Sequence, residues 1–439
     1  METKLARIAE LAKANPKEVF TSLYHYLNEE MLIQCHNELS ADKAAGVDEV
    51  TKEEYEKDLK GNISKLVERL KRHSYKPLPV RRAYIPKDSG KEKRPLGIPA
   101  YEDKIVQQGL RKILEKIYEN DFLDISYGFR PGRGCHDALK ELGSRIMGKT
   151  NHIVDADIKG FFDNVSHEWV MKFIGVRIAD PNIKRLINKF LKAGVMEEGK
   201  IGPTESGTPQ GGVISPLLAN VYLHYALDLW FEKAIKPKLR GEASLVRYAD
   251  DFVCCFQYKE EAEQFYVELK ERLAKFELEI AKNKSKIIEF GRFAAGNRKA
   301  KGIGKPETFD FLGFTHYCSQ TRNGKFTVKR KTSKKKFRAK IKAFATWIRE
   351  KRDTEDIQSI FKTVKLKLQG HYNYYGVTDN YRRIAKYRDI VGKLIFKWLN
   401  RRSQRESFSW DKFNLYLKQN PLPKPRIRVS LWQCSCKVI

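Results

Sequence analysis

The chain of 439 residues is long enough for two or three domains, and its 41% hydrophobic content can fill buried cores. Its 85 Lys and Arg against 55 Asp and Glu give a formal charge of +30, which is typical of a nucleic-acid-binding protein. The charged start of the chain, and the lack of any apolar stretch of membrane-spanning length, argue against a secreted or membrane protein.

The seven cysteines favour an intracellular setting. They are odd in number and scattered, and Cys434 and Cys436 near the end lack partners at the spacing of zinc ligands. We therefore expect free thiols in a reducing compartment and a cytoplasmic protein.

The first 44 residues are predicted to be helical. Apolar side chains recur there at helical intervals, at Ile8, Leu11, Phe20, Leu23 and Leu27. Residues 45–145 combine charged strands and loops, and the first pattern that suggests chemistry follows them.

An acidic strand is predicted within residues 151–163. Side chains alternate between the two faces of a strand, so Asp155 and Asp157 share one face with Ile153. Further along, Asp250 and Asp251 stand side by side between two apolar runs, which predicts a β-hairpin with the carboxylates at its tip.

Three carboxylates on a strand and an adjacent hairpin suit a site for divalent cations. Asp is a common turn residue, so the hairpin alone would be weak evidence. Together with the acidic strand, it can hold two Mg²⁺ ions roughly 3.5–4 Å apart, which activate a 3′-hydroxyl and stabilise a leaving pyrophosphate. The pattern predicts the palm of a polymerase.

The remainder of the chain alternates loops and basic helices. Residues 291–306 are rich in Gly and Lys and are expected to form a loop. Three amphipathic helices are expected after it, with apolar stripes that include Phe337, Phe361 and Tyr387.

Positive charge is concentrated in this last third. From Lys301 to Ile439, 34 Lys and Arg face 10 Asp and Glu, so this part carries +24 of the +30. We expect a basic module that grips the backbone of a long polyanion.

The chain resembles the reverse transcriptases encoded by bacterial group II introns through seven motifs, in the order of that family, across about residues 45–400. The motifs are AGVD at 45–48, IPK at 85–87 with RPLGIP at 94–99, YGFRPGR at 127–133, DIKGFFD at 157–163, GTPQGG at 207–212, YADD at 248–251 and FLGF at 311–314. The resemblance implies an α+β right-hand polymerase. Its parts would be an N-terminal helical extension (1–44), fingers (45–145), palm (146–325), a three-helix thumb and maturase domain (326–402) and a short C-terminal segment without an endonuclease domain (403–439).

The resemblance also implies roles for individual residues. Motif spacing selects Asp157 as the metal ligand, with Asp155 as the alternative, beside Asp250 and Asp251; Ile158 would add a backbone carbonyl. The residues that would hold the deoxynucleoside triphosphate are Lys87, Arg94, Phe162 and Gln210, with Phe162 excluding a ribose 2′-hydroxyl unless it only packs in the core.

Other roles lie around the primer and the RNA. Lys284 would protonate pyrophosphate, although Lys282 and Lys286 are close neighbours. The primer grip would be formed by Phe311, Leu312 and Gly313. The residues expected to bind RNA are Lys335, Lys336, Arg338 and Tyr374, where packing at a helix junction is the alternative for Tyr374.

The implied function is RNA-directed DNA synthesis, with Mg²⁺ (or Mn²⁺ in its place) as cofactor and RNA template, DNA primer or target and dNTPs as partners. Binding of intron RNA would also assist splicing and mobility. A stand-alone bacterial reverse transcriptase (retron, diversity-generating, CRISPR-associated or phage-defence) is one alternative. An RNA-splicing cofactor with a dispensable polymerase is another, and the intact Asp157, Asp250 and Asp251 argue against it.

Overall fold

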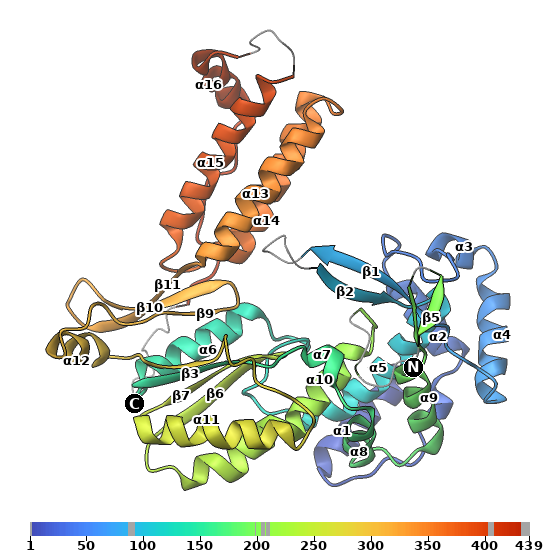
Figure 1. Cartoon of the computed structure of the whole chain (residues 1–439). Helices are drawn as coiled ribbons and strands as arrows, with labels where there is room; N and C mark the ends of the chain where they lie inside the picture. Colours follow the sequence, from blue (N-terminus) through green and yellow to red (C-terminus); the bar gives the residue numbers. More distant parts are fainter. Residues whose placement is uncertain are drawn as a thin grey trace.

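Helices and strands combine in an α+β fold, as the sequence predicts. The computed structural model describes residues 2–86, 93–197, 199–202, 207, 211–402 and 408–431. Figure 1 shows a lower body around a sheet, a strand hairpin that projects at one side, and a group of helices that stands above the sheet. This is the palm, fingers and thumb arrangement of a right hand.

The palm is a four-stranded antiparallel sheet that separates two hydrophobic cores. Its strands, in spatial order, are β6 (Ala243–Tyr248), β7 (Asp251–Phe256), β3 (His152–Asp157) and β8 (Lys286–Glu289). Phe252 and Cys254 of β7 join the core under α11 (Lys259–Ala274), whereas Val253 and Cys255 join the core under α6 (Cys135–Met147). This alternation places odd-numbered side chains of β3 and β7, including the aspartates, on the α6 face.

The larger core joins the N-terminal helices to the fingers and palm. Ile8, Leu23 and Leu27 are buried in it, but Leu11, predicted to belong to the same stripe, is 48% exposed. The helices around this core are α1 (Glu2–Ala14), α2 (Glu29–Glu38), α3 (Lys52–Glu56), α4 (Leu59–Lys71), α5 (Tyr101–Asp121), α7 (Phe161–Asn164), α8 (His167–Gly175), α9 (Pro181–Leu191) and α10 (Ser215–Leu223), with the short helices η1 (Tyr24–Tyr26), η2 (His224–Asp228), η3 (Phe231–Ile235) and η4 (Lys236–Lys238).

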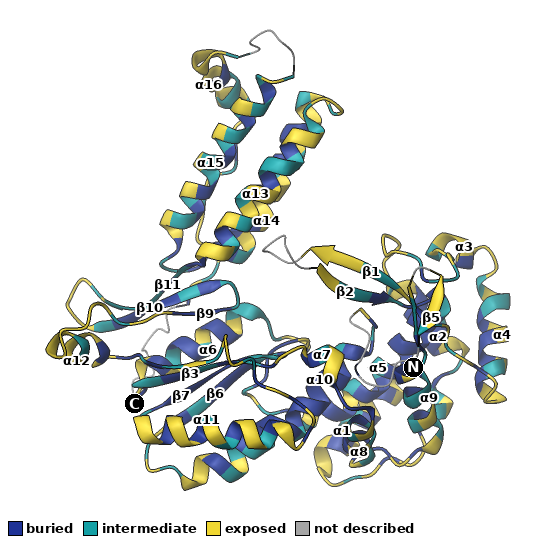
Figure 2. Ribbon diagram, in the orientation of Figure 1, coloured by how far each residue is buried: buried dark blue, intermediate teal, exposed yellow. Residues whose placement is uncertain are grey.

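The fingers carry a second sheet whose tip is open to solvent. Its strands lie in the order β2 (Lys93–Ile98), β1 (Val80–Pro86), β4 (Val195–Glu197) and β5 (Lys200–Gly202). The outer parts of β1 and β2 are exposed (Figure 2), in contrast to the buried strands of the palm. The described outer ends of β1 and β2 are therefore accessible to solvent.

A third sheet links the palm to the thumb. It consists of β9 (Phe309–Phe311), β10 (Phe314–Gln320) and β11 (Phe326–Thr332), and it leads into α13 (Lys334–Lys351), α14 (Ile357–Tyr375), α15 (Tyr381–Leu399) and α16 (Trp410–Gln419). Asn380, which is fully buried, donates from Nδ2 to Thr332 Oγ1 and to the Tyr375 carbonyl, each at 2.8 Å. These bonds fix the base of the helices to the sheet.

The three predicted thumb helices are confirmed, and one predicted loop differs from expectation. Helix α14 continues to Tyr375, so residues 370–375 are its last turns. The expected loop at 291–306 contains α12 (Ala294–Ala300), because Ala, Arg and Lys favour a helix while Gly291 and Gly302 lie beyond its ends. No helix among the described residues is both long and apolar enough to cross a membrane.

Candidate active site

The hairpin of β6 and β7 presents two adjacent carboxylates, as predicted. Tyr248 pairs with Asp251, so the tight turn consists of Ala249 and Asp250. Ala249 adopts a left-handed conformation with φ +57°, which is uncommon for a residue with a side chain. The turn directs Asp250 beyond the end of the sheet, and Asp251 begins β7.

Strand pairing brings the third carboxylate to the same place. Asp157, the last residue of β3, lies directly opposite Asp251 in the antiparallel register. Directly opposed side chains lie on one face of a sheet with their Cβ atoms roughly 4.5–5.5 Å apart. Asp155 lies on that face too, two pairs further back, opposite Val253.

The carboxylates repel one another at this end of the sheet. Burial first, and then the neighbouring Asp155 and Asp250, raise the pKa of Asp251 to about 7. Burial, followed by the charge of Asp157, also raises the pKa of Asp250. Burial raises the pKa of Asp155 to about 6, although the charge of Lys286 opposes the increase. Such a cluster is stabilised by a cation.

Lys284 supplies one positive charge. Its Nζ lies 2.7 Å from Asp157 Oδ2, in a pair whose side chains are 72% and 38% exposed. The same segment binds the strand end, because the Ala281 amide donates to the Asp157 carbonyl at 2.8 Å. Lys286 is directed elsewhere, to the Thr308 carbonyl at 2.9 Å. Of these two lysines, only Lys284 forms an ion pair with an aspartate of the cluster, although Lys286 lies opposite Asp155 in the strand pairing.

The segment after β3 forms one wall of the site. Ile158 is buried, and α7 begins after Gly160, whose φ is +55°. Phe162 is half-buried, with its ring 5.3 Å from that of Phe161 in an edge-on contact. Gly207 lies so close to this wall that a Cβ atom on it would be 2.9 Å from the Phe162 carbonyl oxygen. Glycine is therefore required at this contact, since its φ is also +86°.

The fingers face the carboxylates from the other side. Arg94 on β2 is exposed, and its charge opposes the increase in the pKa of Asp250. Lys87 and Gln210, two of the residues predicted to hold the nucleotide, lie outside the described residues.

The predicted primer grip is the turn between β9 and β10. Phe311 is buried, while Leu312 and Gly313 have φ of +49° and +79°. A backbone hydrogen bond from Leu312 to the carboxyl of Asp251 opposes the increase in its pKa. The Leu312 carbonyl accepts a 2.9 Å bond from the Tyr374 hydroxyl. This turn therefore joins the aspartate cluster to the thumb.

The residues expected to bind RNA occupy different surroundings. Lys335 and Arg338 on α13 are exposed, and Lys336 is half-buried beside Gly313. The half-buried ring of Tyr374 stacks on Phe314 with centroids 5.9 Å apart. Together with its bond to Leu312, this contact favours the packing alternative for Tyr374.

Sequence reasoning missed a set of buried polar residues behind the hairpin. Arg247 was part of an apparently apolar run, yet it is fully buried and paired with Asp228. An arginine inside a strand that reads as buried was the available signal, because an arginine is almost never fully buried without a partner.

Comparison with known proteins gives a consistent result. Residues 85–316 match the family described as reverse transcriptase (RNA-dependent DNA polymerase). The group II intron-encoded protein LtrA of Lactococcus lactis subsp. cremoris is 44% identical over 221 residues, 50% of this chain and 37% of LtrA. Protein YkfC of Escherichia coli K12 is 37% identical over 47% of this chain and 62% of YkfC. The nuclear intron maturase 4, mitochondrial, of Arabidopsis thaliana is 29% identical over 35% of this chain and 19% of that protein. The matches thus span less than two thirds of each relative.

Proposed function

This chain belongs to the reverse transcriptase (RNA-dependent DNA polymerase) family, and from that premise we propose that it extends a primer on an RNA template with divalent metal ions bound to Asp157, Asp250 and Asp251. The observation that carries the proposal is the strand register that opposes Asp157 to Asp251, directly beside Asp250 in the turn.

The residues fit a pair of Mg²⁺ ions. All donors are carboxylate oxygens, which Mg²⁺ prefers, and the raised pKa values of Asp250 and Asp251 reflect crowded negative charge. Within the described residues, no three or more His, Cys, Asp or Glu side chains are grouped so that they could hold a metal ion by themselves. Mg²⁺ usually takes only one or two carboxylates together with substrate phosphates and water, so the protein would supply part of the coordination. Bound ions would lower the pKa of the primer 3′-hydroxyl and neutralise charge on the leaving pyrophosphate.

The surrounding residues would orient the nucleotide. Arg94 would pair with triphosphate oxygens, to which its planar guanidinium can donate two parallel bonds. Phe162 would fill the space of a ribose 2′-hydroxyl, and Lys87 and Gln210 remain predictions for the triphosphate and the nascent base pair. Lys284 would leave Asp157, pair with the pyrophosphate and donate its Nζ proton to a pyrophosphate oxygen. The turn at Phe311, Leu312 and Gly313 would hold the primer end, and the Ile158 carbonyl would face a metal.

We also propose that the chain binds intron RNA and assists splicing. The observation that favours this second function is the +24 charge of residues 301–439, with Lys335 and Arg338 exposed on α13. The names of its relatives, an intron-encoded protein and an intron maturase, point the same way. We also propose a cytoplasmic location, because the number and scatter of the cysteines suggest free thiols in a reducing compartment.

The test is primer extension by the full chain on an RNA template, followed by the same assay with Asp157→Asn. We expect dNTP incorporation by the wild type and its loss in the variant, with unchanged circular dichroism. A wild-type protein that binds RNA and promotes splicing without incorporating dNTPs would instead support the splicing-cofactor alternative. Full activity in the variant would disprove the metal assignment.

A further inference from the structure

A fully buried ion pair lies directly behind the turn that carries Asp250. Arg247 and Asp228 are both 0% exposed, and the pair is bidentate, with Nε 2.7 Å from Oδ1 and Nη2 2.5 Å from Oδ2. Asp228 ends the π-helix η2, and Arg247 is the penultimate residue of β6. The pair therefore fastens the strand that leads into the turn to a separate helical segment.

The same guanidinium also bonds to the turn itself. Its Nη1 donates to the Ala249 carbonyl at 2.9 Å and to Asn220 Oδ1 at 3.0 Å. Ala249 is the residue with the left-handed backbone, immediately before Asp250. Arg247 thus stabilises a conformation that a residue with a Cβ atom adopts at some cost.

The opposite side of the turn is enclosed by a glycine. Asn220 Nδ2 donates to the Gly128 carbonyl at 2.7 Å, and a Cβ atom on Gly128 would lie 2.3 Å from the Ala249 amide nitrogen. One polar network therefore holds the Ala249 carbonyl and keeps another backbone segment against its amide.

Stability alone is a weak reason for such a pair. Removing two charges from water offsets much of their attraction, and well-packed apolar residues in place of a buried pair are often as stable or more so. An apolar pair, however, cannot orient neighbouring polar groups through hydrogen bonds. Arginine has five N–H donors in a fixed plane, enough to reach a carboxylate, an amide oxygen and a backbone carbonyl together.

We propose that Arg247 is a positioning residue for nucleotidyl transfer: held by Asp228 and Asn220, it fixes the Ala249 carbonyl and thereby the place of the Asp250 carboxylate. This rests on the proposed polymerase function. Displacement of a reacting group by about 1 Å can cost roughly a hundredfold in rate, so loss of this contact should be measurable.

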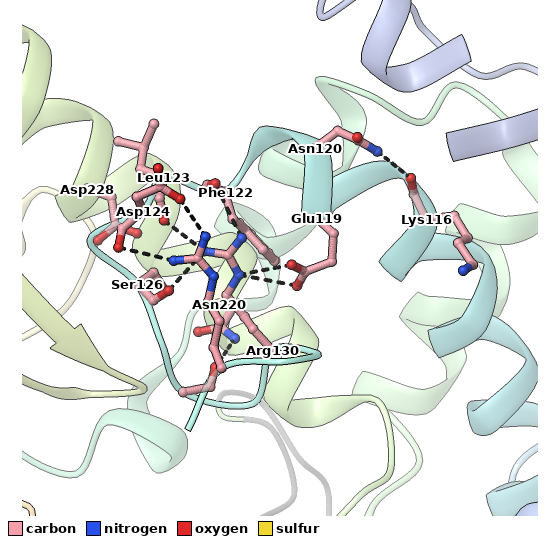
Figure 3. A network of polar contacts seen from close by, with 12 residues as sticks. Lys116, Glu119, Asn120, Phe122, Leu123, Asp124, Ser126, Arg130, Asn220 and Asp228 are labelled. Carbon is pink, nitrogen blue, oxygen red and sulfur yellow. Dashed lines mark hydrogen bonds and ion pairs between the residues drawn. The ribbon is translucent and has the colours of Figure 1, made fainter. Parts of the chain in front are cut away.

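The neighbouring Arg130 provides a matched control. It is 7% exposed, and its Nε lies 3.0 Å from Glu119 Oε2. Its Nη1 donates to the carbonyls of Leu123 and Ser126 at 2.7 and 2.9 Å. Figure 3 shows this network close to Asp228 and Asn220. Arg130 thus bonds to one carboxylate and to three backbone carbonyls, the third being that of Phe122, and none of these acceptors is part of the turn.

The experiment compares Arg247→Lys with Arg130→Lys in the full chain. Lysine keeps the positive charge but cannot bond to three acceptors in one plane. Thermal unfolding, kcat and KM for dTTP on poly(rA)·oligo(dT), and Mn²⁺ binding by electron paramagnetic resonance would be measured for each. We expect similar losses of Tm. Only Arg247→Lys should lower kcat by about tenfold or more, raise the Mn²⁺ dissociation constant severalfold and leave KM within about threefold.

Each result of this experiment either supports or overturns the positioning role of Arg247. Equal kcat and equal Mn²⁺ affinity in the two variants would overturn the positioning role and leave Arg247 a structural residue. If Arg247→Lys does not fold, Asn220→Ala keeps the ion pair and removes the bond that orients Nη1, together with the bond from Asn220 Nδ2 to the Gly128 carbonyl. A smaller shift in the same direction supports the proposal, and an unchanged kcat and Mn²⁺ affinity overturns it. A wild-type chain without primer extension would defeat the polymerase function itself, while the difference in Mn²⁺ affinity would still test the positioning role.

Discussion

The palm carries a cluster of largely buried negative charges, whereas the thumb carries positive charges that are exposed to solvent. On the palm, Asp155, Asp157, Asp250 and Asp251 crowd at one end of a sheet, and burial raises the pKa of Asp251 to about 7. On the thumb, the positive charges stand in solvent, as on Lys335 and Arg338. A cluster of partly buried like charges is costly, so its presence indicates that the position of each carboxylate matters. Exposed charges cost little and act mainly through their number. Chemistry should therefore depend on single palm residues, and RNA binding on the summed charge of the thumb.

The largest effect is expected from Asp250→Asn. The substitution keeps the size of the side chain and removes the charge that would hold a metal, so dNTP incorporation should fall by roughly a hundred- to a thousandfold or more. Single-turnover primer extension on RNA measures the loss. Asp310→Asn is the control, because this nearby carboxylate on β9 accepts a bond from Thr315 and lies outside the hairpin. Comparable losses in both variants would show that dNTP incorporation depends on the total negative charge and not on the position of Asp250.

The next effect concerns discrimination between sugars. Phe162→Val should open the space beside the incoming sugar and raise incorporation of ribonucleotides relative to deoxyribonucleotides by roughly ten- to a hundredfold. The measurement is the ratio of kcat/KM for UTP and dTTP on the same RNA template. Phe161→Leu provides the control for packing, since Phe161 is buried and lies against the same ring. An unchanged ratio with normal dTTP turnover would return Phe162 to a purely packing role.

The sequence predicted the palm well because its strongest signals are local. Alternation predicted that Asp155 and Asp157 share one face of a strand. The apolar runs on either side of Asp250 and Asp251 predicted a turn between the two runs. The strand pairing confirms both predictions. Helical periodicity likewise predicted α13, α14 and α15, since each stripe packs within one core.

What the sequence could not predict depends on contacts between distant segments. Arg247 bonds to Asp228 and Asn220, which lie 19 and 27 residues away, and no local pattern relates the three. The pairing of Lys284 with Asp157 spans 127 residues. Tyr374 is another case: it was expected to bind RNA or to pack at a helix junction, and its bond to Leu312 becomes visible only once the third sheet is folded against α14.

A third prediction tests whether the crowded carboxylates weaken the fold. The pKa of Asp251 is raised from 3.8 to about 7, so the folded metal-free protein binds a proton more tightly than the unfolded chain. Stability from this group is full below about pH 4 and is lost as pH rises towards 7. Asp251→Asn should therefore raise the unfolding free energy of the metal-free protein at pH 8 by on the order of 1–2 kcal/mol.

Thermal melts at pH 5 and pH 8 measure this effect. The gain in Tm of Asp251→Asn over the wild type should be larger at pH 8 than at pH 5, and Mg²⁺ should stabilise the wild type more than the variant. Equal Tm values for the two proteins at pH 8 would show that the carboxylate cluster is not strained.

The smallest effect is expected on the thumb. If α13 contacts RNA through phosphates, reversing Lys335, Lys336 and Arg338 to Glu should reduce the slope of log affinity against log salt by about one for each lost contact. The Asp250→Asn variant should keep the wild-type slope and still support splicing, because binding by exposed charges needs no catalytic metal.

The control must separate local from total charge. Lys57, Lys60 and Lys65, reversed to Glu, change the net charge by the same amount; they are exposed near α4, at the outer edge of the fingers (Figure 1). Filter binding of intron RNA across a salt series should show a reduced slope for the α13 variant and a nearly unchanged slope for the control. Equal slopes in the two triple variants would mean that overall charge attracts the RNA, and that α13 makes no phosphate contacts of its own.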